Sequence, residues 1–175
     1  PVLLVAGEGG AAYAGSARAG AELPGGSQLL RFCVGVGRRW LAPVVELAAA
    51  GDDELLALPL HAQQEWLPRA LRLRHLQRAL INVVNLLGVP VVAGAGAEGG
   101  AGDALLPGQR EALLRHVAGL GPRRAAHVAT ALLPIGARAD LRRGAGALGP
   151  TVYANCAGFL RLVPGAGPRG ARGRQ

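Results

Sequence analysis

Two short glycine–proline turns, each beside stretches with helical patterning, restrict the fold of this chain more than any other feature. The first turn, residues 119–122, lies between predicted helices over 108–118 and 123–133, and the second, 148–150, precedes a predicted helix over 151–158. Glycine permits a sharp reversal of the backbone, and proline is tolerated in the first turn of a helix. The sequence therefore predicts two helical hairpins that follow each other closely.

A hairpin of this kind can hold a phosphate group of DNA. Glycines in the turn let backbone N–H groups approach the phosphate without side-chain obstruction, and the positive end of the following helix adds to the attraction. Arg123 and Arg124 add cations beside the first turn, whereas Thr151 stands at the corresponding place in the second. A tight interhelical turn without a ligand is the alternative that the spacing leaves open. The predicted DNA-binding residues are Gly119, Gly121, Arg123, Arg124, Gly149 and Thr151.

The distribution of charge favours an anionic partner for the second part of the chain. All 19 basic residues are arginines, and the formal net charge is +8. Residues 1–65 hold four arginines and seven acidic residues, a net charge of −3, whereas residues 66–175 hold fifteen arginines and four acidic residues, a net charge of +11. Because phosphate contacts carry no base information, the predicted binding of duplex DNA is independent of sequence and sensitive to salt.

Apolar periodicity predicts further elements before the hairpins. Helices are predicted over 28–41 and over 68–87, the second followed by a glycine that stops it. Strands are predicted over 1–6 and 55–60, and strand, helix, strand in this order fits the last part of an α/β layer domain. Four arginines of the longer helix lie mostly off its apolar stripe and are interpreted as a solvated face: Arg69, Arg72, Arg74 and Arg78.

Two segments are too rich in glycine to form regular elements. Residues 93–102 are predicted to be a loop, and residues 163–175, composed mainly of Gly, Pro and Arg, a disordered tail. Within the loop, residues 94–99 have the spacing of a dinucleotide-binding loop, but glycines continue where a helix would have to begin. A Walker loop is excluded because it needs a lysine, and the chain has none.

No arrangement of residues in the sequence is typical of catalysis. Ser16 and Ser27 are the only serines. Cys33 and Cys156 are far apart and are predicted to be reduced, packed thiols. The acidic residues cluster in one turn, 52–54, or stand alone rather than converging on a metal. We therefore expect no catalytic residue, metal, cofactor or small-molecule substrate, and the lack of a long apolar run predicts no membrane span. A start without Met indicates a piece of a longer protein.

The segments around both turns have recognisable sequences. GLGPRRAA covers 119–126 and LGPTVYANCAGFLR covers 148–161, with the stretch NCAGFL at 155–160 the most specific part. These segments resemble the paired hairpins of the Spt-six family of eukaryotic transcription elongation factors and histone chaperones. The resemblance extends upstream, where LPLH at 58–61 is similar to the start of the family's hairpin domain, and residues 28–47 to the end of its YqgF-like domain.

The resemblance implies a mainly α fold with three parts. A helix-hairpin-helix domain would occupy residues 61–162, preceded over 1–60 by part of a ribonuclease-H-like, YqgF-like α/β domain and followed over 163–175 by the tail. The chain differs from the family pattern at two places within these domains. Ala42-Pro43 stands where the family often has Asp-Pro, and residues 90–92 stand where it often has Asp-Val-Asn.

The function that the resemblance implies is that of a nuclear, non-enzymatic scaffold. Such a protein travels with RNA polymerase II, binds duplex DNA and histones, and helps to reassemble nucleosomes. One alternative is a protein-interaction module in which the hairpins only brace helices, with histones or polymerase as partners. Another is a bacterial Tex-like transcription accessory protein that binds RNA or DNA.

Overall fold

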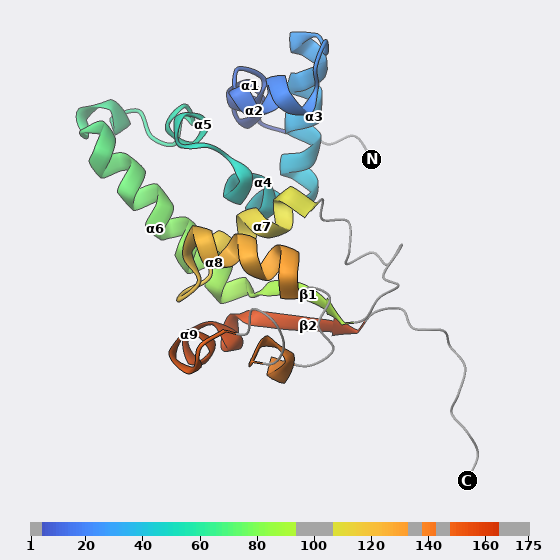
Figure 1. Cartoon of the computed structure of the whole chain (residues 1–175). Helices are drawn as coiled ribbons and strands as arrows, with labels where there is room; N and C mark the ends of the chain where they lie inside the picture. The colour runs from blue at the N-terminus through green and yellow to red at the C-terminus, as the bar shows by residue number, and fades with distance from the viewer. Residues whose placement is uncertain (1–4, 94–106, 133–137, 143–147, 165–175) are drawn as a thin grey trace. The chain divides into compact units, whose positions relative to one another are not determined.

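The structure, a computed structural model, describes residues 5–93, 107–132, 138–142 and 148–164, and these are mainly helical, as predicted (Figure 1). The chain divides into two compact units, Pro1–Val83 and Val84–Gln175. The long helix α6 crosses from one unit to the other. Each unit is described by itself.

The first unit is built from helices joined by short turns. Its elements are α1 (Glu8–Ala14), α2 (Ala17–Glu22), α3 (Gln28–Leu41), α4 (Pro43–Ala49), α5 (Asp52–Leu56), a 3-10 turn η1 (Gln64–Trp66) and the first part of α6 (Arg69–Leu87). The bounds of α3 and α6 confirm the two predicted helices. Serine side chains cap α2 and α3: Ser16 accepts a hydrogen bond from the N–H of Ala19, and Ser27 from that of Leu30.

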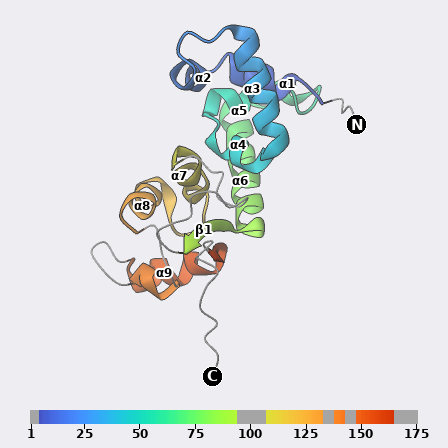
Figure 2. The same ribbon diagram turned by 90° about the vertical axis from the view of Figure 1, so that its right-hand side faces the viewer.

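Glycine allows α1 and α3 to approach each other closely, and the two helices lie side by side in Figures 1 and 2. A Cβ added at Gly35 of α3 would lie 2.8 Å from Cδ1 of Tyr13 in α1. The Tyr13 side chain is almost fully buried at this contact. The small residue in α3 therefore makes the space that the tyrosine ring fills.

The predicted strand over 55–60 is wrong, because the segment begins inside helix α5. Asp52, Asp53 and Glu54 form the first turn of α5, where acidic side chains stabilise the positive end of a helix. The side chains of Leu55 and Leu58 are buried and pack with Leu80 of α6. Of the predicted strand over 1–6, residues 1–4 lie outside the described residues, and residues 5 and 6 precede α1 without regular structure. The YqgF-like α/β segment stays a prediction.

The second unit joins short helices to a two-stranded parallel sheet. After the end of α6 come β1 (Val89–Ala93), α7 (Pro107–Arg115), α8 (Gly121–His127), a π-helical turn η2 (Val128–Leu132), the 3-10 turns η3 (Arg138–Arg142) and η4 (Ala157–Phe159), α9 (Pro150–Cys156) and β2 (Leu160–Pro164). Three of these, α7, α8 and α9, correspond to the helices predicted around the two turns.

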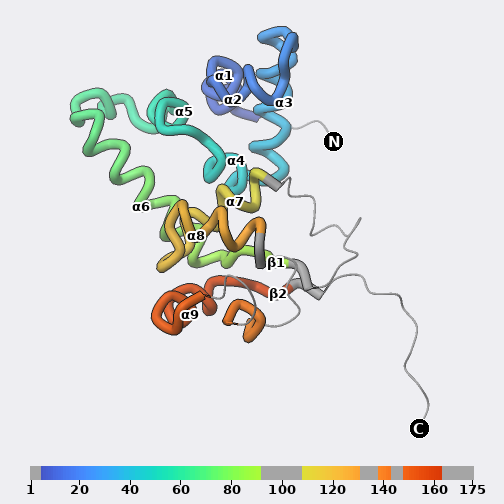
Figure 3. The backbone as a smooth tube through the Cα atoms, viewed as in Figure 1, coloured from blue at the N-terminus to red at the C-terminus, as the bar shows by residue number. Residues whose placement is uncertain are grey.

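Strands β1 and β2 were not predicted, and they come from opposite ends of the unit. They pair in parallel, with Val89 opposite Leu160 and Ala93 opposite Pro164. Figure 3 shows the two strands running side by side. Thus Ala93 belongs to a strand, and β2 continues two residues into the predicted tail; residues 94–102 and 165–175 lie outside the described residues. Gly88, with φ of +72°, turns the chain from α6 into β1, so the predicted helix stop is confirmed.

Candidate nucleic-acid interface

The first hairpin consists of α7, a turn through Gly119 and Leu120, and α8. Leu114 of α7 and Ala125 of α8 are fully buried, and Leu120 is 3% exposed, so apolar packing fixes the two helices on either side of the turn. Gly119 and Gly121 both have positive φ, +86° and +67°. L-residues other than glycine rarely adopt this conformation, so the sequence of the turn is dictated by its backbone.

The two glycines of this turn meet different surroundings. A Cβ added at Gly119 would lie 2.7 Å from Cβ of Asn155 in α9, whereas one added at Gly121 would meet nothing within 4 Å. Gly119 therefore allows the first hairpin to pack against the helix of the second. Gly121 leaves open space on the side where a Cβ would stand, so no side chain obstructs the approach of a phosphate to its backbone.

The two predicted arginines follow this open backbone. Both Arg123 and Arg124 are exposed. Nη1 of Arg124 donates a hydrogen bond to the carbonyl oxygen of Gly119 at 3.3 Å, which holds that guanidinium beside the turn. Within the described ranges, no ion pair engages the guanidinium of Arg123. Its charge is available to an anion from outside the chain.

The second turn offers fewer groups that could bind a phosphate than the first. Gly149 and Thr151 are exposed, and Gly149 precedes Pro150 at the start of α9. The turn is held in place by Leu148, whose N–H donates to the carbonyl oxygen of Leu141 at 2.8 Å. Neither predicted residue carries a charge, so this turn can offer only backbone and hydroxyl groups to a phosphate.

A cation that the sequence did not indicate lies beside the second turn. The guanidinium of Arg142 lies over the ring of Tyr153 in α9, 5.4 Å from its centroid. Arg142 is exposed. Since it comes from η3 rather than from α9, only the folded chain brings this charge to the second hairpin. A cation–π contact of this kind has no local sequence signal.

Asn85, near the end of α6, fixes the approach to the first turn. Its side-chain oxygen accepts a hydrogen bond from the N–H of Ala118 at 3.0 Å, and its side-chain nitrogen donates to the carbonyl oxygen of His116 at 3.1 Å. Both partners belong to the segment that leads from α7 into the turn. The amide side chain thus satisfies backbone groups at a helix end where the regular pattern stops.

Replacing Asn85 with Ala is expected to destabilise the second unit by about 1–3 kcal/mol, because it leaves a backbone donor and acceptor without their partner. Urea denaturation followed by circular dichroism measures the change. Asn82→Ala is the matched control, since Asn82 is an exposed asparagine of the same helix. An equal effect of both substitutions would show that Asn85 does not hold the turn.

Cys156 is fully buried at the end of α9. Burial raises the pKa of its thiol, so the group stays protonated at neutral pH. Both cysteines are free thiols, as predicted. The prediction that both are packed holds for Cys156 but is wrong for Cys33, which is exposed on α3. Among the described residues, no group of three or more His, Cys, Asp or Glu side chains is placed to hold a metal ion.

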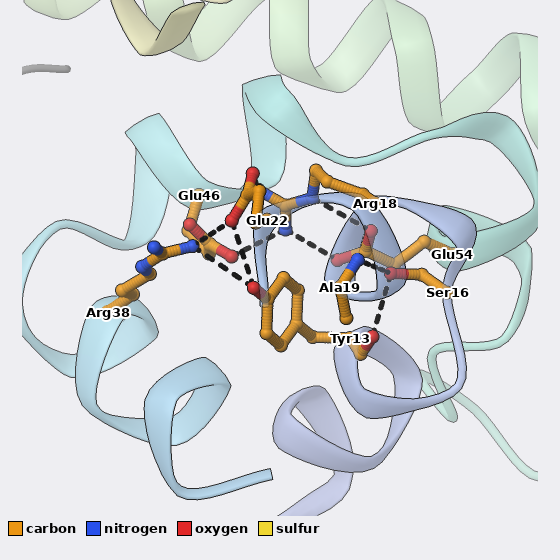
Figure 4. Close-up of polar contacts among 8 residues, drawn as sticks. All are labelled: Tyr13, Ser16, Arg18, Ala19, Glu22, Arg38, Glu46 and Glu54. Carbon is orange, nitrogen blue, oxygen red and sulfur yellow. Dashed lines mark hydrogen bonds and ion pairs between the residues drawn. The ribbon is translucent and has the colours of Figure 1, made fainter. Parts of the chain in front are cut away.

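A cluster of charged side chains in the first unit has a structural role (Figure 4). Arg18 binds two acidic residues, with Nη2 at 2.5 Å from Oε1 of Glu46 and 2.8 Å from Oε1 of Glu54. Its guanidinium also lies 4.7 Å from the centroid of the Tyr13 ring. Glu46 and Glu54 are 5% and 8% exposed, so the arginine is the shared cationic partner of two carboxylates that the fold has removed from water.

Glu22 extends this cluster toward the surface. Tyr13 donates its hydroxyl to Oε2 of Glu22 at 2.9 Å, and Arg38 forms an ion pair with the same oxygen. Partial burial acts to raise the pKa of Glu22, but the hydrogen bonds from Arg38 and Tyr13 outweigh it and lower that pKa.

The lowered pKa of Glu22 predicts a contribution to acid sensitivity. A carboxyl group with a depressed folded-state pKa stabilises the fold above its unfolded-state pKa and loses that contribution as the pH falls through the folded-state value. We expect Glu22→Gln to be less stable than the unmodified chain at about pH 6 and to lose less stability down to about pH 3. Urea midpoints at both pH values measure this, and parallel loss in both proteins would contradict it.

Comparison with known proteins identifies the class first. The family model described as "Helix-hairpin-helix motif" matches residues 53–163. Together with the two packed turns, this match makes the chain a helix-hairpin-helix protein. No helix in the described ranges is long and apolar enough to cross a membrane.

The particular family follows from individual relatives. "Transcription elongation factor spt-6" of Neurospora crassa is 34% identical over 85% of the chain, and "Transcription elongation factor SPT6" of Kluyveromyces lactis is 32% identical over 93%. The Mycosarcoma maydis protein of the same name is 34% identical over 86%. The chain belongs to the SPT6 family, which confirms the predicted resemblance. It spans about a tenth of the length of these relatives.

Proposed function

We propose that this chain is a non-enzymatic segment of a transcription elongation factor that holds duplex DNA by its phosphates, without sequence specificity. The observation that carries the proposal is the first turn, where the open backbone of Gly121 precedes two exposed arginines. Membership of a helix-hairpin-helix family supports it. The six residues predicted from the sequence remain the proposed contact set, with the first turn contributing more than the second.

The proposed domains are those of the sequence prediction. Residues 61–162 form the helix-hairpin-helix domain, and residues 1–60 come from a YqgF-like domain. The proposed tail is 163–175, of which residues 163 and 164 extend β2. The longer protein acts in the nucleus, with histones and the RNA polymerase II elongation complex as partners, and assists nucleosome reassembly. Histones are basic, so the part with a net charge of −3, residues 1–65, is the part proposed to meet them.

Fluorescence anisotropy with a labelled duplex tests the DNA-binding proposal. We expect a dissociation constant on the order of 10⁻⁴ to 10⁻⁶ M near physiological salt, the same for unrelated sequences and rising steeply with salt. Gly121→Val should weaken binding, because a β-branched residue is strained at positive φ and covers the open backbone. Binding that neither depends on salt nor changes in this variant, in a chain with native circular dichroism, would overturn the proposal.

A further inference from the structure

Helix α6 carries a stripe of exposed side chains on the side away from the core. The stripe consists of Leu67, just before the helix, and four helical residues: Leu71, Arg74, Arg78 and Ile81. The four helical residues are spaced three, four and three positions apart, as in the heptad pattern with which one helix contacts another. Leu67 lies in extended backbone immediately before this pattern. All five lie in the first unit.

The inner side of α6 is already occupied, which separates the stripe from the core. Leu80 is 7% exposed and packs with Leu55 and Leu58, and Leu76 packs against the same cluster. By contrast, Leu67, Leu71 and Ile81 are 47%, 39% and 40% exposed. The apolar residues of the stripe therefore do not contribute to the described core.

The two arginines lie in the middle of the stripe and have no partner in the described part of the chain. Arg69 forms an ion pair with Asp53, but none involves Arg74 or Arg78. A cationic centre between apolar ends defines the chemistry of a complementary surface. That surface needs apolar groups at both ends and carboxylates between them.

We propose that the α6 stripe, residues 67–81, docks an amphipathic helix of a protein partner, whose contact face is apolar at its ends and acidic at its centre. A second copy of this chain fits poorly, because in-register pairing of two stripes in either direction places arginine opposite arginine. Duplex DNA fits poorly as well, since the exposed Leu67, Leu71 and Ile81 have no counterpart on a phosphate backbone. This inference does not rest on the proposed DNA contact.

The test uses the whole chain and two synthetic peptides of three heptads. The acidic peptide has Leu at the outer contact positions and Glu at the two central ones, and the basic peptide has Lys in place of those two Glu. Anisotropy titrations compare the unmodified chain with Arg74→Glu/Arg78→Glu. The matched control is Arg123→Glu/Arg124→Glu, which changes the charge equally at the first hairpin turn.

The unmodified chain is expected to bind the acidic peptide and not the basic one. The Arg74→Glu/Arg78→Glu variant should bind the acidic peptide about tenfold or more weakly than the unmodified chain does, and should bind the basic peptide instead. The hairpin control should keep the preference of the unmodified chain. This exchange of specificity requires a folded protein, so loss of structure cannot imitate it. Similar affinity of the unmodified chain for both peptides would overturn the proposal. So would a dimer in sedimentation that Arg74→Glu/Arg78→Glu dissociates.

Discussion

Reversing the charge of Arg123 and Arg124 together should weaken duplex DNA binding by about tenfold to a hundredfold at low salt, because two cations become anions beside the phosphate site. The dependence of log Kd on log salt should also become shallower by about two, roughly one for each lost phosphate contact. Anisotropy titrations over a salt series give both quantities. The structure favours a large effect, since both arginines are exposed next to the open backbone of Gly121.

The matched control for this prediction is Arg74→Glu/Arg78→Glu. It makes the same change in net charge at residues of the first unit that belong to neither turn, and should alter DNA affinity much less. If both double variants reduced affinity and salt dependence equally, DNA would be responding to the overall charge of the chain. The assignment of the first hairpin as the contact site would then be wrong.

Replacing Arg18 with Met should destabilise the first unit by about 3–5 kcal/mol, because it leaves two buried carboxylates without their cation. Glu46 and Glu54 are less than a tenth exposed, and both bind the same guanidinium. Methionine retains much of the length of the arginine stem, so the loss of stability comes more from the missing charge than from the missing volume. Urea denaturation measures the free energy of unfolding.

Arg69→Met provides the comparison, because Arg69 and Asp53 form an ion pair whose side chains are 66% and 89% exposed. Such surface pairs contribute about 0–1 kcal/mol. Adding Glu46→Gln and Glu54→Gln to Arg18→Met should recover part of the stability, since the uncompensated charges are then removed. Equal losses for the two arginine variants would show that the cluster around Arg18 contributes no more than a surface pair.

Helices were predictable where the apolar pattern and the end signals agreed. The pattern of α6 repeats over five turns and stops at a glycine, and α3 follows a serine cap and ends before Pro43. The apolar pattern of residues 55–60 is too short to distinguish a helix from a strand. Its closely spaced leucines suited a strand equally well, and only packing against α6 decides for a helical turn.

The parallel sheet could not be predicted from local sequence. Strand β1 contains Pro90, which argues against a strand, and its partner β2 lies at the far end of the unit. Parallel pairing between distant segments leaves no turn signal in the sequence. For the same reason, the family resemblance identified both hairpins without indicating how they are joined.

The sequence named the residues of the candidate site but not the contacts that hold them in place. The sequence indicated Gly121, Arg123 and Arg124 because glycines and cations mark a phosphate-binding turn. It did not distinguish Gly119, whose small size permits contact with α9, from Gly121, whose backbone is open. The bracing amide of Asn85 depends on a contact between residues more than thirty positions apart. Such contacts exist only after folding.

The pairing of β1 and β2 also determines how the second unit would respond to tension along the polypeptide. The two strands are parallel, so a force that pulls on the chain before Val89 and after Pro164 acts along both strands in opposite directions. Their hydrogen bonds are then loaded in shear, all at once, and do not open one after another. This arrangement would keep the two hairpins together when the chain is pulled from both sides of the sheet.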